Sequence, residues 1–413
     1  MSSSNQKRFT FDPIESERAK ICVVGVGGGG GNALNNMIAQ GIEGVDFIAV
    51  NTDAQALSAN RAQHKFQAGR DFTKGLGAGA RPQVGQKAVE ESIDDIAKML
   101  DGYDMAFVTA GMGGGTGTGG APVVAKAARD LGILTVGVVT KPFDCEGKRR
   151  MEYAENGIQQ LQEHVDTLIV IPNERLLDIS DASTSLIEAF RLVDEVLYNA
   201  TRGISDLITI HGIINLDFAD VKTTMQDGGR ALMGSAVATG ANRAQDAAMA
   251  AISSPLLDGF SIVGAKNLLV NVTAGRSLGL REATQATDII KQESQGDCEV
   301  IFGTVIDDSM DEELRVTVIA TGFDRREKPK APVHVLDGRY KGEDNLRDLD
   351  TPAYMRRPKT ESESNKGGTT PAPEADNQGV RVRRLDVNQL NRQPDRASQD
   401  GSDTPAFLRK MLD

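Results

Sequence analysis

The sequence predicts an α/β protein with a doubly wound parallel sheet, a long central helix and a smaller C-terminal α+β domain. Between residues 20 and 140, apolar runs typical of buried strands alternate with helical patterns, and glycine-rich segments follow the strands. A helical pattern of roughly 25 residues then runs from Thr184 to Leu207. Beyond it, shorter strands and helices alternate as far as Phe323.

The elements of the first domain follow from apolar runs and glycine stops. A buried strand is predicted at Ile21–Gly25, and the glycines from Gly27 to Gly31 are expected to form a loop before a helix at 32–40. The next predicted elements are strand 45–50, a helix around 87–100, strand 105–109, a glycine-rich loop at 113–119 with a helix after it, and strand 133–139.

The central helix is predicted because the apolar residues of segment 184–207 cover more than one face, as expected for a helix between two domains. A helical pattern at 148–163 and a strand at 167–171 precede it. The C-terminal domain is predicted to contain helices at 240–252 and 280–294 and strands at 267–273, 299–305 and 315–321.

The composition excludes several classes of protein. A formal net charge of −12 over 413 residues argues against general nucleic-acid binding. No segment is long and apolar enough to span a bilayer, and the N-terminus lacks the apolar core of a signal peptide, so no direct membrane insertion is expected. Three cysteines without a Cys-x-x-Cys pair indicate a reduced, cytoplasmic protein, and four scattered histidines indicate no protein-built zinc site.

The segment Gly113–Gly119, which reads GGGTGTG, carries the clearest chemical signal. Between a strand and a helix, its backbone N–H groups can converge on an anion, and the helix N-terminus adds partial positive charge. The hydroxyls of Thr116 and Thr118 are expected to donate to phosphate oxygens. The segment lacks the lysine of a P-loop, so it predicts a different kind of phosphate-binding site.

The first glycine run supports two interpretations. Gly25-x-Gly27-x-x-Gly30, with Asp53 after the next strand, fits the dinucleotide fingerprint of a nicotinamide-dependent oxidoreductase. However, such an enzyme does not need a second phosphate-binding loop. Two glycine-rich segments at the ends of strands fit a nucleotide whose polyphosphate is held from both sides.

Together these motifs resemble those of the tubulin/FtsZ family of GTPases, over about residues 18–323 and the C-terminal peptide. Residues 113–119 are similar to the family's signature. Within the family, Gly25–Asn32 (GVGGGGGN) and Asn215–Asp220 (NLDFAD) resemble the bacterial cell-division branch rather than eukaryotic tubulin. The resemblance implies that the chain binds GTP and GDP and hydrolyses GTP.

The resemblance also implies which residues bind the nucleotide. The first glycine run, a loop around residue 79 and the second glycine-rich segment would contact the phosphates. Glu146 and Arg150 would lie at the ribose and phosphate side, and three further residues would form the base pocket. The implied residues are Gly28, Gly29, Gly30, Gly31, Asn32, Ala78, Gly79, Ala80, Gly115, Thr116, Gly117, Glu146, Arg150, Asn173, Phe190 and Asp194.

Physical chemistry agrees with the implied base pocket. Phe190 and Asp194 are four residues apart, so they face the same side of the central helix. The ring can stack on a purine, and the carboxylate can accept hydrogen bonds from guanine N1–H and the 2-amino group. Adenine lacks both donors there and would leave the carboxylate unpaired, which is a strong basis for rejecting it.

The resemblance assigns catalysis to Asn215, Asp217 and Asp220. It implies that these residues approach the GTP bound to the next subunit, where the two aspartates polarise the attacking water and Asn215 helps to position it. Mg²⁺, held mainly by the nucleotide phosphates, would offset their charge. Hydrolysis would then require head-to-tail assembly into a homopolymer, through a contact that does not close on itself.

On this basis we expect six parts along the chain. They are a disordered N-terminal extension (1–19), a GTP-binding domain (20–183), the central helix (184–210), a GTPase-activating C-terminal α+β domain (211–325), a disordered linker (326–402) and a partner-binding tail peptide (403–413).

The tail contains an internal repeat. Asp403–Lys410 resembles the family's tail peptide, and Asp350–Arg357 matches it with all eight positions identical or similar. We expect Asp403–Lys410 to dock onto division proteins and membrane tethers, and Asp350–Arg357 is a second candidate for the same role. The resemblance thus implies a cytoplasmic protein at the mid-cell division ring, on the inner face of the membrane.

Two positions depart from the family pattern: Arg81 stands where asparagine is frequent, and Gly120 where alanine is frequent. No effect can be assigned to Arg81 from the sequence.

Besides the oxidoreductase, a second alternative is a filament scaffold that binds GTP without hydrolysing it. Phosphate release on assembly distinguishes a GTPase from such a scaffold.

Overall fold

The structure is a computed structural model that describes residues 19–178, 180, 184–210, 212, 214, 216–257, 262–295 and 298–323. The expectations for the N-terminal extension, Asn215, the linker and both copies of the tail motif fall outside the described residues. Within them, no helix is both long and apolar enough to cross a membrane.

The first part of the chain alternates strands and helices, as expected. Its elements are β1 (Ile21–Val26), α1 (Gly27–Ala39), β2 (Val45–Asn51), α2 (Ala54–Ala59), β3 (His64–Gln67), α3 (Arg70–Thr73), α4 (Pro82–Glu90), α5 (Ile93–Leu100), β4 (Met105–Gly111), α6 (Thr116–Asp130), β5 (Leu134–Lys141), the 3₁₀ turn η1 (Asp144–Glu146), α7 (Lys148–Gln162), β6 (Thr167–Pro172) and α8 (Glu174–Leu177).

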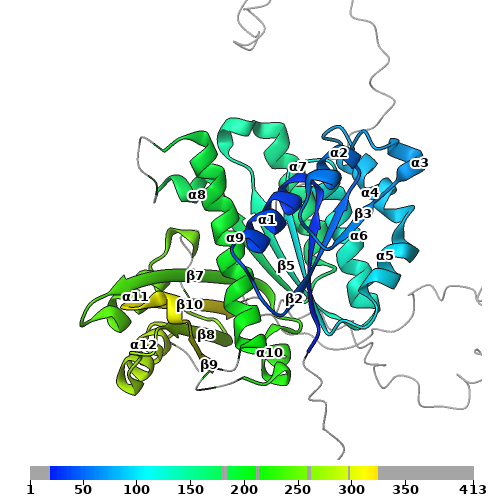
Figure 1. Cartoon of the computed structure of the whole chain (residues 1–413). Helices are drawn as coiled ribbons and strands as arrows, with labels where there is room; N and C mark the ends of the chain where they lie inside the picture. Colours follow the sequence, from blue (N-terminus) through cyan, green and yellow to red (C-terminus); the bar gives the residue numbers. More distant parts are fainter. Residues whose placement is uncertain are drawn as a thin grey trace, which may run out of the picture. The chain divides into compact units, whose positions relative to one another are not determined.

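A long helix and a smaller α+β part follow. The elements are α9 (Leu186–Thr209), α10 (Phe218–Met225), β7 (Gly229–Thr239), α11 (Arg243–Ile252), η2 (Pro255–Leu257), β8 (Asn267–Ala274), α12 (Leu280–Glu293), β9 (Glu299–Ile306), η3 (Asp308–Met310) and β10 (Glu313–Thr321). Figure 1 shows α9 between the first part and the sheet formed by β7 to β10.

The strands form one sheet in the order β3-β2-β1-β4-β5-β6-β7-β10-β8-β9. Strands β1 to β6 are parallel to their neighbours, whereas β10 is antiparallel to both β7 and β8. The strand order reverses at the β1–β4 pair, and in open α/β sheets a ligand binds beside the carboxyl ends of the strands at such a point. The predicted doubly wound fold with a smaller α+β domain is confirmed.

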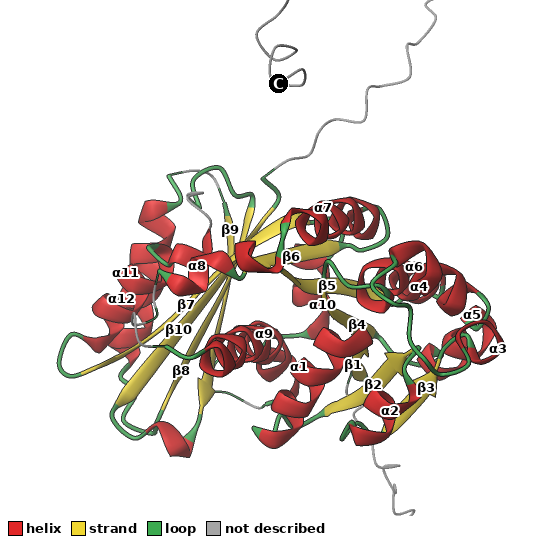
Figure 2. Ribbon diagram, turned by 90° about the horizontal axis from the view of Figure 1, so that it is seen from above, coloured by secondary structure: helices red, strands yellow, loops and turns green. Residues whose placement is uncertain are grey.

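Helices cover both faces of the parallel part of the sheet. Helices α4 to α7 lie on one face, and α1, α2 and α9 on the other (Figure 2). Strand β1 contributes to both cores because successive side chains point to opposite faces: Ile21 and Val23 pack toward α1 and α9, and Cys22 and Val24 pack toward α6. A third core joins α11 and α12 to the C-terminal strands.

The predicted central helix, α9, begins with a capping box. The Ser185 hydroxyl accepts from the Glu188 N–H, and the Glu188 carboxylate accepts from the Ser185 N–H at 2.8 Å. The helix contacts α1 and β5 on one side and β8 and β9 on the other. It is therefore buried on more than one face, as its apolar pattern predicted.

Three features differ from the expectations. The first glycine run is not a loop, because α1 already begins at Gly27. The helix expected around 87–100 is two helices, α4 and α5. Strand β7 is missed by sequence reasoning because it is rich in Gly and Ala, which have low strand propensity. Its pairing with β10 and with the start of β6 outweighs that propensity and joins the two domains into one sheet.

Candidate functional site

The two glycine-rich segments meet at the carboxyl ends of β1 and β4. Gly27 adopts a positive φ of 74°, and a Cβ added to it would lie 2.7 Å from the backbone nitrogen of Gly117. Only glycine allows this approach without strain. The N-terminal turns of α1 and α6 therefore lie side by side, and both can direct N–H groups and dipole charge toward one anion.

A cavity of about 430 Å³ opens at this point. It is lined by fourteen of the sixteen residues that the family resemblance implied, namely Gly28, Gly29, Asn32, Ala78, Gly79, Ala80, Gly115, Thr116, Gly117, Glu146, Arg150, Asn173, Phe190 and Asp194. Of the implied residues, Gly30 and Gly31 are absent from this described lining. Gly30 is packed against the Thr109 carbonyl, and the Gly31 carbonyl accepts from the Asn60 side chain at 2.8 Å.

The two threonines of the glycine-rich segment do not have the same role. The Thr118 hydroxyl is buried and accepts from the Gly113 N–H at 2.8 Å, so it shapes the segment from within. Thr118 is absent from the described lining of the cavity, so the structure does not place its hydroxyl where a phosphate would bind. The Thr116 hydroxyl lies 2.6 Å from that of Thr52, at the wall of the cavity.

The loop before α4 has a strained backbone. Gly79 and Ala80 both have positive φ values, 58° and 57°, and the value is unfavourable for alanine. Strain of this kind is typical of functional sites, where the surrounding structure holds it in place.

Glu146 and Arg150 form an ion pair at the cavity wall, with Oε2 and Nη1 2.8 Å apart. The other carboxylate oxygen of Glu146 accepts from the Phe143 N–H at 2.9 Å. Two partners fix this carboxylate, while the half-exposed guanidinium of Arg150 keeps donors free for a ligand.

The cavity lining also contains unpaired polar groups. The buried Asn173 Oδ1 has no hydrogen-bond partner among the described residues. Asp194 is partly buried and forms no hydrogen bond or ion pair with another described residue, and burial raises its pKa to about 6. Unsatisfied groups of this kind indicate that a ligand supplies the missing partners.

Phe190 belongs to the same lining. Its ring packs edge-to-face on Phe143, with ring centroids 5.4 Å apart, and remains 41% exposed. The Phe143 contact fixes the ring while one face stays available for stacking. Asn173, Phe190 and Asp194 thus all line the cavity, although Asn173 is on a different element.

The implied catalytic residues lie elsewhere. Asp217 precedes α10 and Asp220 lies in its first turn, and both side chains are exposed. The other end of α10 is tied to the start of β6, because the Thr167 hydroxyl donates to the Met225 carbonyl. The cavity is at the opposite edge of the parallel sheet, beyond the end of β6, which is about 20 Å long. Figure 1 shows α10 at the lower end of the strands.

Sequence reasoning misses part of the cavity lining. The further lining residues are Asn51, Asp53, Ala56, Leu76, Gly77, Gly111, Met112, Gly114, Thr140, Pro142, Val193 and Leu197. Asn51 ends β2 and Thr140 lies near the end of β5. Because the carboxyl ends of parallel strands share one edge, the residue directly after a predicted strand, such as Asn51 or Thr140, was an available signal.

The carboxylates at the cavity already have defined surroundings. Asp53 accepts hydrogen bonds from two N–H groups at the start of α2, and Glu146 pairs with Arg150. Asp194 lines the cavity from α9. In the part of the chain that the structure describes, no group of three or more His, Cys, Asp or Glu side chains is placed to hold a metal ion.

Comparisons with known proteins agree with this geometry. Residues 20–181 match the GTPase domain of the Tubulin/FtsZ family, and residues 229–324 match the C-terminal domain of the FtsZ family. The chain is similar to an empty FtsZ dimer from M. jannaschii, with 43% sequence identity and a TM-score of 0.73. That match covers 76% of this chain and 90% of the other.

Two more distant structures share the fold. The GDP-bound monomer of CetZ1 from Haloferax volcanii is 23% identical with a TM-score of 0.65, over 74% of this chain and 95% of that one. The GTPγS-bound protofilament of CetZ2 from the same organism is 22% identical with a TM-score of 0.62, over 75% and 95%.

Fold, cavity and matches together define a GTP-binding GTPase with a tubulin-like fold. The oxidoreductase and the non-hydrolysing scaffold are therefore set aside. The chain belongs to the tubulin/FtsZ family and, within that family, to FtsZ, a group of cell-division GTPases.

Proposed function

We propose that this GTPase polymerises head to tail and hydrolyses GTP at the contacts between subunits. One observation carries the proposal: the nucleotide cavity and the exposed Asp217 and Asp220 lie at opposite edges of the same parallel sheet. A chain with this arrangement cannot bring its own acids to its own nucleotide. The FtsZ dimer and the CetZ2 protofilament, both relatives in fold, support self-association.

The base of GTP binds between Phe190, Asn173 and Asp194. The exposed ring face of Phe190 stacks on the guanine, and Asp194 accepts from N1–H and the 2-amino group. The orphaned Asn173 Oδ1 gains a donor from the ligand. Each unsatisfied group on the protein side therefore finds a partner of the complementary type.

The phosphates bind at the N-terminal turns of α1 and α6 and at Ala78–Ala80, where backbone N–H groups converge. Arg150 lies at the ribose and phosphate side and adds positive charge. Mg²⁺ would be held mainly by phosphate oxygens and would offset their charge, because the described residues include no group of three or more His, Cys, Asp or Glu side chains that could hold it.

Hydrolysis is completed by the next subunit. Asp217 and Asp220 polarise the attacking water, and Asn215 helps to position it. The contribution is positional and electrostatic, as expected for phosphoryl transfer. The domain division proposed from the sequence follows this scheme: a GTP-binding domain (20–183), a central helix (184–210) and a GTPase-activating domain (211–325).

The tail connects the polymer to other proteins. Asp403–Lys410, and as a second candidate Asp350–Arg357, dock onto division proteins and membrane tethers and hold the polymer at the mid-cell ring, on the inner face of the membrane. Each copy contains a proline, an aromatic residue, an aliphatic residue and two basic residues, a composition typical of peptides that order in a groove.

Turnover against protein concentration tests the proposal. The GTPase rate per subunit is expected to rise cooperatively with concentration and to parallel the amount of sedimented polymer. Asp217→Ala is expected to keep GTP binding and lose roughly 100-fold or more of the turnover. A rate per subunit that does not depend on concentration, or near-normal turnover of Asp217→Ala, contradicts the proposal.

A further inference from the structure

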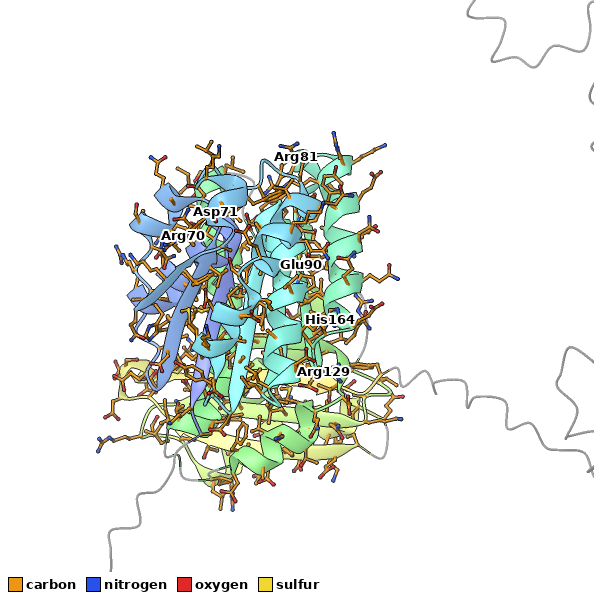
Figure 3. The ribbon with its side chains drawn as sticks, turned by 90° about the vertical axis from the view of Figure 1, so that its right-hand side faces the viewer. Arg70, Asp71, Arg81, Glu90, Arg129 and His164 are labelled. Carbon is orange, nitrogen blue, oxygen red and sulfur yellow. The ribbon has the colours of Figure 1, made fainter. Side chains whose placement is uncertain are left out.

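Helix α6 connects the two functional edges of the domain. Its first turn, at Thr116 and Gly117, lines the nucleotide cavity, and its last turn carries Arg129. The helix has 15 residues and is about 22 Å long, so it extends from the cavity edge of the sheet to the α10 edge. In Figure 3, Arg129 lies at the opposite end of this face from Arg81, which precedes α4 beside the cavity.

The guanidinium of Arg129 has three partners, two in the connection between α7 and β6 and one in the turn between α10 and β7. One Nη lies 3.1 Å from the Asp227 carboxylate, and the other donates to the Glu163 carbonyl at 3.2 Å. Its Nε lies 3.8 Å from the carboxylate of Asp166, which is buried and also accepts from the Thr135 N–H at 2.9 Å. The planar, five-donor guanidinium suits a junction of this kind, whereas a lysine offers a single point charge.

Asp227 lies in the turn that ends α10. Its φ of 52° is in the left-handed region, and Gly228 follows it before β7 begins at Gly229. The Asp166 carbonyl accepts from the Gly229 N–H at 2.9 Å, so the residue that faces Arg129 also binds the turn directly. Arg129 thereby contacts both ends of the connection that fixes α10 against the sheet.

We propose that Arg129 is a positioning residue for hydrolysis: by holding Asp227, it sets the angle at which α10 presents Asp217 and Asp220 to the next subunit. This inference rests on the proposed function. It deepens that function by linking the helix that binds phosphate in one subunit to the acids that this subunit offers to its neighbour. Arg129 touches neither nucleotide nor water in this scheme.

The first experiment measures single variants in the full chain. Arg129→Met is expected to keep GTP affinity and sedimentation close to wild type while kcat falls about tenfold, because a small displacement of a catalytic group is costly. Arg129→Lys is expected to recover only part of the loss. Lys126→Met removes the same charge from an exposed position of the same helix, without an ion pair among the described residues, and is expected to match wild type.

A mixing experiment then locates the defect. Asp194→Ala subunits, at a GTP concentration that they do not bind, still offer both Asp217 and Asp220, whereas Asp217→Ala subunits bind GTP but offer only Asp220. Mixing Arg129→Met with Asp194→Ala is expected to raise turnover above the sum of the two alone. Mixing it with Asp217→Ala is expected to give no such gain, because neither partner offers both acids well placed.

Three outcomes overturn the inference. The inference is wrong if the kcat of Arg129→Met equals that of the wild type. Loss of sedimentation or GTP affinity together with kcat assigns Arg129 to general folding. The reversed pattern, with rescue by Asp217→Ala and not by Asp194→Ala, places the defect in the variant's own nucleotide site. Failure of the proposed function is recognised separately, since Asp217→Ala alone would then turn over normally.

Discussion

The surroundings of Asp194 indicate a binding position for a ligand with hydrogen-bond donors. A carboxylate that is partly buried without a partner loses hydration and gains nothing in return, which is why its pKa rises to about 6. In the nucleotide-free protein, the folded state therefore favours the protonated form of Asp194 more than the unfolded state does. Guanine changes this balance, because its two donors stabilise the ionised form.

The raised pKa predicts opposite effects of pH on folding and on binding. The pKa of an aspartate without this environment is 3.8, so stability of the nucleotide-free protein falls as pH rises from about 4 through 6. Affinity for GTP changes the other way, because binding needs the ionised form: we expect it to be about fourfold weaker at pH 5.5 than at pH 7.5. Calorimetric titration at both values measures this, and Asp194→Asn should show no such difference.

The same residue predicts base specificity. Asparagine in place of Asp194 offers one acceptor and one donor, which match the N1–H and the 2-carbonyl of xanthine but not the 2-amino group of guanine. Asp194→Asn is expected to weaken GTP binding about 100-fold and to bind XTP more tightly than GTP. Competition with a fluorescent nucleotide measures both affinities. Unchanged preference for GTP would remove Asp194 from the base pocket.

At the scale of elements, helix termini build the site. Helices α1 and α6 begin at the cavity, and the capped start of α9 fixes the turn that carries Phe190. We expect Ser185→Ala to lower the free energy of unfolding by about 1 kcal/mol and to weaken GTP binding, because the first turn of α9 frays without its cap. Chemical denaturation and nucleotide titration measure the two effects. Ser253→Ala, at an exposed serine without a side-chain hydrogen bond among the described residues, is the control.

Local patterns predicted most of these elements but not their junctions. The alternation of apolar runs and glycine stops was sufficient for the parallel strands β1, β2, β4, β5 and β6 and for α9, but not for the short edge strand β3. Strand β7 could not be found, because its small residues become a strand only through β6 and β10 on either side. The glycines from Gly27 are helical for a similar reason: the neighbouring α6 packs closely against them, and a window of sequence contains no such partner.

Contacts between residues outside the motifs could not be predicted from the sequence. The family resemblance implied the fourteen lining residues, and only the glycine runs and the i,i+4 pair Phe190 and Asp194 had local signals of their own. Gly30 and Gly31 belong to the same run as Gly28 but face the strand and Asn60, because a helix turns successive residues to different sides. The contacts of Arg129 join positions almost a hundred residues apart and have no sequence signature.

At the scale of the whole molecule, the two functional edges are separated by the length of the sheet. The cavity lies at the carboxyl ends of the parallel strands, and α10 lies at their amino ends. Under the proposed function, such a domain completes its site by stacking on another copy in the same orientation. The surfaces in contact are then different on the two subunits, so the assembly grows as a filament rather than closing as a symmetric pair.

A mixture of two inactive variants tests this division most directly. Asp217→Ala subunits bind GTP but lack one of the two proposed catalytic acids, and Asp194→Ala subunits offer both acids without binding GTP at the concentration used. Each variant alone is expected to hydrolyse little GTP, and an equal mixture is expected to recover a substantial fraction of wild-type turnover at contacts where the first presents GTP to the second. A mixture whose turnover equals the sum of its parts, with the two variants sedimenting together, would contradict a site shared between subunits.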